Sequence, residues 1–243
     1  MEQFTSEETP YQQPQLTLTP EEASRVTGRF MTRVYGWMAA ALALSGAVAL
    51  WVGSSATMQE LLFGSRWVFL GLLLAQVVTV GFLSGKGLEW SAGTTTGVFM
   101  GYALLNGLTL GIIFLLYTAE SIASTFFITA GTFGVMSLYG YFTGTDLSRW
   151  GNLLFMGVIG LILASVVNMF LASSTLYWIT SFVGVLLFVA LTAYDTQKVK
   201  TLAFLGLEDE STDRKAAVLG ALTLYLDFIN LFLYLLRFFG RRR

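Results

Sequence analysis

The chain of 243 residues contains no cysteine and no histidine. Without cysteine, disulfides, thiol nucleophiles and thiolate metal sites are excluded. Without histidine, a pH response near neutrality must come from carboxyl groups that keep their proton to unusually high pH. The absences remove most catalytic arrangements, and we predict no catalytic residues and no bound cofactor.

Charge is also scarce. Only 12% of the residues are charged, about half the share that is usual in soluble domains. Hydrophobic residues make up 55%, and the mean hydropathy is +0.67. Such a chain cannot hide its apolar surface from water, so its main partner is a lipid bilayer. The formal net charge of −1 argues against nucleic acid as a partner.

Long apolar runs set the expected architecture. A hydrocarbon core of about 30 Å is crossed by about 20 helical residues. The segments that satisfy this length are 34–52, 67–85, 92–116, 121–142, 151–171, 176–196 and 216–239. We therefore predict an all-α polytopic membrane protein with seven transmembrane helices in one domain, residues 31–243.

The first 30 residues are polar and acidic, and they lack the basic start and short apolar core of a cleaved signal. We expect residues 1–30 to be a flexible tail that leads into a short interfacial helix. Thr19 is the expected cap of that helix, and Pro20 is its expected first residue.

The basic residues predict an orientation. Nine of the fourteen lie on the N-terminal side of the predicted spans, whereas the opposite loops contain only Arg66. The positive-inside rule then places the N-terminus on the cytoplasmic side of the membrane. That membrane is the plasma membrane, or the inner membrane in a Gram-negative cell. Residues 241–243 are also basic and end outside if the last segment crosses. A re-entrant last segment would return them inside, but 216–239 is long enough to cross, so we predict seven full spans. The nine residues are Arg25, Arg29, Arg33, Lys86, Arg149, Lys198, Lys200, Arg214 and Lys215.

Three pairs of glycines are spaced by four residues, which lets membrane helices approach closely. We expect them to pack helices within one bundle rather than to form a dimer interface. The pairs are Gly97 and Gly101, Gly107 and Gly111, and Gly140 and Gly144.

Two aspartates fall where a charge is expensive. On insertion scales a charged side chain near the middle of a bilayer costs at least about 2.5–3.5 kcal/mol, and such residues usually face the bundle interior. Asp227 lies well inside the last span, with Asn230 on the same helical face. Asp195 lies near the end of the sixth span and close to Lys198, so a hydrated helix end is the alternative there. From the helical rise per residue, Asp227 lies about 8–12 Å deeper in the bilayer than Asp195. Helix tilt or a longer sixth helix would bring the two residues to the same depth.

If the two carboxyl groups meet, they cannot both ionise cheaply. The pair then holds one proton through a hydrogen bond and titrates as a unit. Loss of that proton creates repulsion in a site of low dielectric constant and can push two helices apart. The doubly ionised state is a hard oxygen site suited to Ca²⁺, which makes Asp195 and Asp227 candidate Ca²⁺ ligands.

Other polar residues lie within the predicted spans. Gln76, Asn106 and Asn168 either form hydrogen bonds between helices or line a pore, and the former role is the more common.

Three stretches resemble the Bax inhibitor 1 family, also called the transmembrane Bax-inhibitor-motif family. They are AYDTQ at 193–197, LYLDFINLF at 224–232 and AGTFGVMSLYG at 130–140. The likeness runs from about Val34 to Gly240 and is greatest to the bacterial inner-membrane branch. It implies a seven-helix fold in which the last helix is surrounded by the other six. It also implies that Asp195 and Asp227 sense pH and gate a Ca²⁺ leak that closes when they share a proton.

One feature departs from the resemblance, which implies an arginine near the end of the second span that engages the aspartates as a latch. This region reads GFLSGKG at 81–87, without arginine. Lys86 is the nearest basic residue and a candidate gating residue, although a lysine lacks the bidentate geometry of arginine. Asn230, Asn106 and Asn168 are the other candidate gating or pore-lining residues.

Two alternative functions remain at this stage. Intramembrane aspartyl proteases also carry aspartates on neighbouring spans, but their Gly-x-Gly-Asp motif is missing at Asp227, and all three prolines precede residue 21, so their Pro-Ala-Leu motif is missing too. A non-conducting regulator that binds a membrane protease or assembly factor is the other. The channel hypothesis expects Ca²⁺ and protons as partners. The regulator hypothesis expects another membrane protein as its partner.

Overall fold

The computed structural model describes residues 19–205 and 209–243, and within them it is all-helical, with seven helices long and apolar enough to cross a membrane. Two short 3₁₀ turns, Ser148–Trp150 and Leu202–Phe204, adjoin the helices. The helices are α1 (Pro20–Ser54), α2 (Ala56–Phe63), α3 (Arg66–Lys86), α4 (Ala92–Leu110), α5 (Ile113–Leu116), α6 (Ala119–Phe142), α7 (Gly151–Leu171), α8 (Ser174–Thr201) and α9 (Glu210–Phe239).

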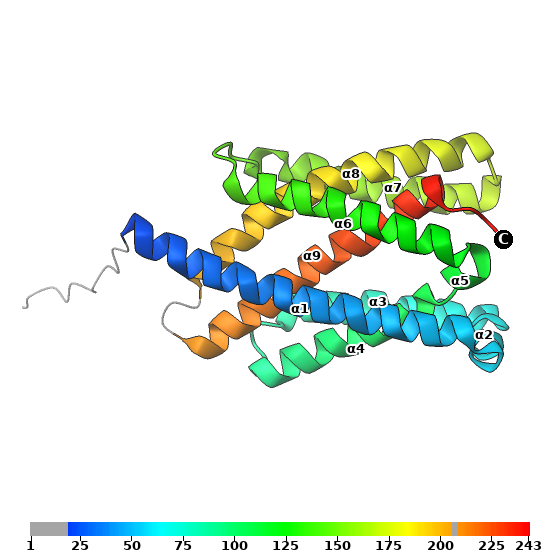
Figure 1. Cartoon of the computed structure of the whole chain (residues 1–243), viewed down its shortest axis with the longest axis horizontal. Coiled ribbons are helices and arrows are strands. Elements are labelled where there is room, and N and C mark those ends of the chain that lie inside the picture. Colours follow the sequence, from blue (N-terminus) through cyan, green and yellow to red (C-terminus); the bar gives the residue numbers. More distant parts are fainter. Residues whose placement is uncertain (1–18, 206–208) are drawn as a thin grey trace, which may run out of the picture.

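The last helix is central, as predicted. In its most apolar stretch 72% of the residues are buried, against 6% in α3 and in α7. Helices α1, α4, α6 and α8 pack directly on α9, whereas α3 packs mainly on α4 and α7 on α8. Figure 1 shows α9 running between the group of α6, α7 and α8 and the group of α1, α3 and α4. Of the charged residues on α9, Asp227 is the one that this enclosure buries.

The first helix begins as predicted but is longer than predicted. Thr19 caps α1 in a reciprocal capping box with Glu22, and Pro20 is the first helical residue. The expected short interfacial helix is the first part of α1, which continues without a break to Ser54. Its early apolar residues Phe30 and Val34 are already buried in the core. Residue 30 thus lies inside α1, and residues 1–18 of the predicted tail lie outside the described part of the chain.

The last helix is unbroken from Glu210 to Phe239 and runs the length of the bundle, as a full crossing requires. At its start, Asp213 pairs with Arg33 of α1, and Lys215 Nζ donates to the Leu88 carbonyl at 2.9 Å. Beyond its other end, Thr118 N donates to the Arg241 carbonyl at 3.0 Å, and Tyr117 forms a bridge with Arg242. We call these the Arg33 end and the Arg242 end of the bundle.

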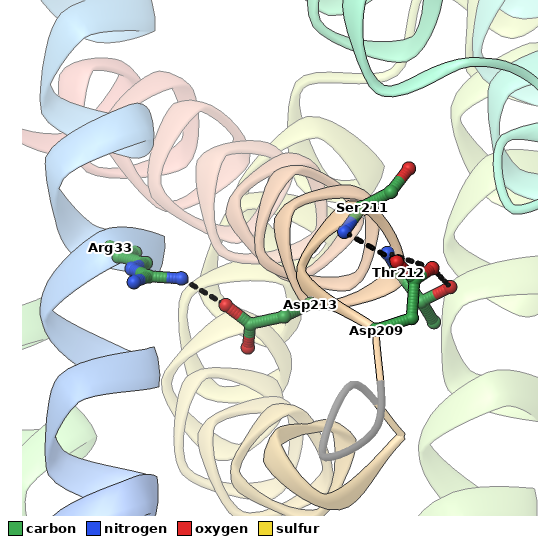
Figure 2. Close-up of polar contacts among 5 residues, drawn as sticks. All are labelled: Arg33, Asp209, Ser211, Thr212 and Asp213. Atoms are coloured by element: carbon green, nitrogen blue, oxygen red, sulfur yellow. Dashed lines mark hydrogen bonds and ion pairs between the residues drawn. The ribbon is translucent and has the colours of Figure 1, made fainter.

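The start of α9 is fixed by polar contacts (Figure 2). The Asp209 carboxylate accepts hydrogen bonds from Ser211 N, Thr212 N and Thr212 Oγ1 at 3.0, 2.9 and 2.6 Å. These bonds hold the pKa of Asp209 below its ordinary value of 3.8, with the Thr212 hydroxyl as the largest cause. One helical turn away lies the pair of Arg33 and Asp213, which is the single ion pair within residues 19–205 and 209–243. The central helix is therefore anchored at the Arg33 end.

We expect Asp209→Ala to lower the thermal unfolding midpoint at neutral pH, because the cap of α9 is lost. A lowered pKa in the folded state stabilises the protein above pH 3.8, and this contribution is lost as pH falls through the lowered pKa. The difference between wild type and variant should therefore shrink below pH 3.8. Asp209→Ser keeps a capping oxygen without charge, so it should lose less stability. A neutral-pH midpoint equal to wild type in Asp209→Ala would contradict this role.

The predicted packing of glycines within the bundle is confirmed at Gly107, Gly111 and Gly140. A side chain at Gly107 or Gly111 would collide with α1, and one at Gly140 would collide with the Ala193 carbonyl of α8. The contact at Gly140 holds the backbones of α6 and α8 together near Asp195. The other three glycines of the pairs, Gly97, Gly101 and Gly144, have no such neighbour within 4 Å among the described residues.

Candidate functional site

The two aspartates lie on the contacting helices α8 and α9. Helix α8 ends at Thr201 rather than at the predicted residue 196, so Asp195 lies inside the helix and not at a hydrated end. Its side chain is half-buried, whereas Asp227 is only 5% exposed. Both carboxyl groups are thus held in the protein, with the deeper one on the central helix.

Close contacts between α8 and α9 fix their register. A Cβ at Gly220 would lie 2.7 Å from Val199 Cγ1, and a Cβ at Gly184 would lie 2.5 Å from the Tyr234 ring. In this antiparallel register Asp227 lies about one helical turn, ~5.4 Å, beyond the point opposite Asp195. The longer sixth helix therefore narrows the expected gap, and the carboxyl groups of Asp195 and Asp227 are close enough to act on each other electrostatically.

One oxygen of the deeper aspartate has no ordinary donor. Asp227 Oδ2 is buried and accepts no hydrogen bond from any residue that the structure describes. A buried carboxylate oxygen without a donor is costly. A proton shared between Asp195 and Asp227 would remove that cost, because one carboxyl would then donate to the other.

Few cations act on this pair. Lys198, one turn beyond Asp195 on the same helix, is the nearby cation that acts electrostatically on the Asp195 carboxyl. Lys86 lies exposed at the end of α3, a helix that packs mainly on α4, and the structure does not bring it to the aspartates. Across the described residues no three carboxylates cluster in a way that could hold a metal ion. The pair is therefore a two-carboxyl site.

The three asparagines named from the sequence are not brought together. Asn230, one turn beyond Asp227, donates to the Leu226 carbonyl of its own helix at 2.8 Å. Asn106 is buried in α4 and donates to the Tyr102 hydroxyl at 3.2 Å. Asn168 lies at the Arg242 end, where its Oδ1 accepts from Ser173 N at 3.0 Å and fixes the α7–α8 turn. Gln76, by contrast, binds α4 through Leu105 and Thr109 and is the expected hydrogen bond between helices.

Sequence reasoning missed three hydroxyl contacts near the aspartates. Ser137 of α6 binds both Tyr35 of α1 and Thr196 of α8, the residue after Asp195. On the other side of α9, the Tyr225 hydroxyl binds Ser45 of α1 at 2.7 Å.

The available signal for these contacts is a row of hydroxyl residues along one face of α6, spaced by four or eight. This row comprises Ser121, Thr125, Thr129 and Ser137, all buried.

Seven helices that are long and apolar enough to cross a bilayer, packed around a central one, define a multi-pass membrane protein. The model of the family described as inhibitor of apoptosis-promoting Bax1 matches residues 27–243. The chain belongs to this Bax inhibitor family.

Its relatives are bacterial proteins, and some of them are named as membrane proteins. It is 55% identical over 215 residues to the inner membrane protein YbhL of Escherichia coli K12, covering 88% of this chain and 92% of that protein. It is 44% identical to an uncharacterized protein, RP147, of Rickettsia prowazekii, with 88% and 90% covered. It is 33% identical to the uncharacterized membrane protein SpyM3_0260 of Streptococcus pyogenes serotype M3, with 75% and 78% covered. The predicted resemblance is confirmed.

Proposed function

We propose that this protein is a pH-sensitive Ca²⁺ leak channel gated by Asp195 and Asp227. The observation that carries the proposal is that Asp195 and Asp227 lie on the contacting helices α8 and α9, with Asp227 Oδ2 buried and lacking a donor. Only a shared proton makes that arrangement inexpensive. The closed state is then the singly protonated pair.

Opening follows from loss of the shared proton. Two unit charges about 4 Å apart repel by about 4 kcal/mol at an effective dielectric constant of about 20. A free energy of this size changes a two-state equilibrium by about three orders of magnitude. The repulsion acts between α8 and α9, so it favours their separation, and the leak increases as pH rises.

The separated carboxylates offer hard oxygen ligands to a passing cation. Ca²⁺ prefers such ligands, and as a permeant ion it has to bind weakly enough to leave. Buried hydroxyl oxygens add to the polar surface nearby, on α8 at Thr192 and Thr196 and on α6 at Thr129 and Ser137. In this mechanism Ca²⁺ is cargo, and Asp195 and Asp227 are transient ligands.

In the proposed mechanism, water approaches Asp195 from the Arg33 end. A pocket of about 490 Å³ opens there between α8 and the α6–α7 loop, and it is lined by Tyr194, Gln197 and Lys198. Lys198 is the same residue that acts on the Asp195 carboxyl. Protons can therefore exchange with the half-buried Asp195 while Asp227 stays enclosed.

The test is Ca²⁺ flux into liposomes that hold only this protein, measured across pH. A flux that rises with pH supports the channel. Cleavage of a transmembrane reporter would instead support an aspartyl protease, and neither flux nor cleavage would favour a non-conducting regulator of a membrane protease or assembly factor. We propose that the protein is not an enzyme, since Asp227 is almost fully enclosed and its sequence lacks the protease motif.

We also propose that the Arg33 end faces the cytoplasm, because the nine basic residues named above lie there. Cysteine labelling is clean because the chain has no cysteine of its own. Arg243→Cys should react with an impermeant maleimide in intact cells, and Ser211→Cys only after permeabilisation. Both residues are exposed, so access is matched. The reverse pattern would invert the proposed orientation.

A further inference from the structure

A polar pocket of about 560 Å³ lies at the Arg242 end, at the opposite end of the bundle from the Lys198 pocket. It lies between the α7–α8 turn and the end of α9. Its lining includes two arginines, an asparagine and two serines but no acidic residue. The polar lining residues are Asn168, Ser173, Ser174, Tyr177, Arg237 and Arg242.

The two arginines converge on one tyrosine. The guanidinium carbons of Arg237 and Arg242 lie 5.6 and 5.7 Å from the centre of the Tyr177 ring, and Arg242 Nη2 also donates to the Tyr177 hydroxyl at 3.2 Å. Arg237 is further held over the Tyr234 ring at 4.8 Å. Contact with a ring face orients a guanidinium without using most of its five N–H donors. The pocket thus presents two pre-oriented sets of donors.

No protein carboxylate neutralises these charges in the described part of the chain, where the one ion pair is Arg33–Asp213 at the other end. Other donors are near. The Ser174 hydroxyl lines the pocket in the first turn of α8, and Asn168 uses its Oδ1 for the turn, which leaves its amide N–H groups as donors. Two arginines beside hydroxyl and amide donors suit a phosphate group, which accepts several charge-assisted hydrogen bonds.

The surroundings place this pocket at a membrane surface. Trp178 and Phe238 form an edge-to-face pair on its wall with ring centroids 5.3 Å apart, and Trp178 is 53% exposed. Phe170, at the end of α7 beside the pocket, is 83% exposed. Tryptophan and exposed apolar residues next to arginine are typical of the boundary between headgroups and hydrocarbon.

We propose that this pocket binds the phosphate of an anionic phospholipid in the leaflet at the Arg242 end. The phosphate lies between Arg237 and Arg242, and the acyl chains lie along the exposed apolar faces of α7 and α8. The ligand ties the end of the central helix to the α7–α8 turn, so the bound lipid stabilises the closed bundle at the end opposite the aspartates.

The test is native mass spectrometry of the full chain in detergent, titrated with phosphatidylglycerol, phosphatidylcholine or inorganic phosphate. Wild type should retain one tightly bound phosphatidylglycerol. The double variant Arg237→Gln/Arg242→Gln should bind it at least about tenfold more weakly, as expected for loss of charged hydrogen bonds. The matched control Arg241→Gln/Arg243→Gln removes the same charge from the same end outside the pocket and should bind like wild type. Arg237→Lys/Arg242→Lys, which keeps the charge but loses the fork, should be intermediate.

Equal loss in both glutamine double variants would overturn the proposal, because it would show general attraction to basic residues. So would unchanged binding in Arg237→Gln/Arg242→Gln. Binding of inorganic phosphate alone, lost only in the pocket variant, would support the phosphate site but assign it to a soluble ion. The unfolding midpoints without lipid should match among the variants. If Arg237→Gln/Arg242→Gln unfolds at a lower temperature, Arg237→Lys/Arg242→Lys becomes the test variant. Wild-type binding by that lysine variant would overturn the requirement for arginine.

Discussion

Asp195→Asn and Asp227→Asn should each abolish the pH dependence of Ca²⁺ flux rather than scale it. One amide beside one carboxyl can form a hydrogen bond in either protonation state. The repulsion between two anions, which opens the closed pair in our proposal, is then absent at every pH. The double variant should resemble each single variant, because the two residues act as a unit.

The measurement is the shape of the flux–pH curve in liposomes, with Lys86→Ala as control. Lys86 is exposed at the end of α3 and away from the pair, so its loss should leave the midpoint and slope unchanged. At high pH the double aspartate variant should also unfold at a higher temperature than wild type, which must then bear two nearby negative charges. A wild-type midpoint and slope in either single variant would rule out the carboxylate-pair mechanism. A pH-independent leak in Lys86→Ala would instead make Lys86 a latch.

Hydropathy was sufficient to predict the seven spans, because each span is a long apolar run bounded by polar or turn residues. It could not predict where helices run on beyond the bilayer. Helix α1 begins at Pro20, where the capping box starts it, and it continues without a break into its apolar part. Helix α8 runs on past the end of its hydropathy signal to Thr201, and this extension decides whether Asp195 is at a wet end or within the protein.

The site was only partly predictable. Cost in the bilayer indicated Asp195 and Asp227 individually, but the distance between them depends on the register of α8 against α9. That register is set by close contacts at Gly184 and Gly220, two glycines that no local motif distinguishes. From the sequence, the basic residues at the C-terminus bore only on which side of the membrane the chain ends. Only the fold brings Arg237 and Arg242 to Tyr177, since the tyrosine is far away in the chain.

A covalent link between α8 and α9 should abolish the flux. Opening requires these helices to separate. The contact of Val199 with Gly220 joins them about one helical turn from Asp195. A Cβ at Gly220 would lie 2.7 Å from Val199 Cγ1, so cysteines at both positions can form a disulfide with little backbone movement. The chain has no other cysteine to compete. Val199→Cys makes room for the side chain that Gly220→Cys adds.

The decisive measurement is Ca²⁺ flux through the double variant Val199→Cys/Gly220→Cys at high pH, before and after reduction in the same liposomes. Free-thiol labelling gives the fraction that is cross-linked, and the two single variants report any effect of the substitutions alone. We expect flux to be lost in proportion to cross-linking and to return on reduction with its pH dependence intact. A fully cross-linked protein that conducts with the wild-type pH profile would show that α8 and α9 need not separate, and would contradict gating by the aspartate pair.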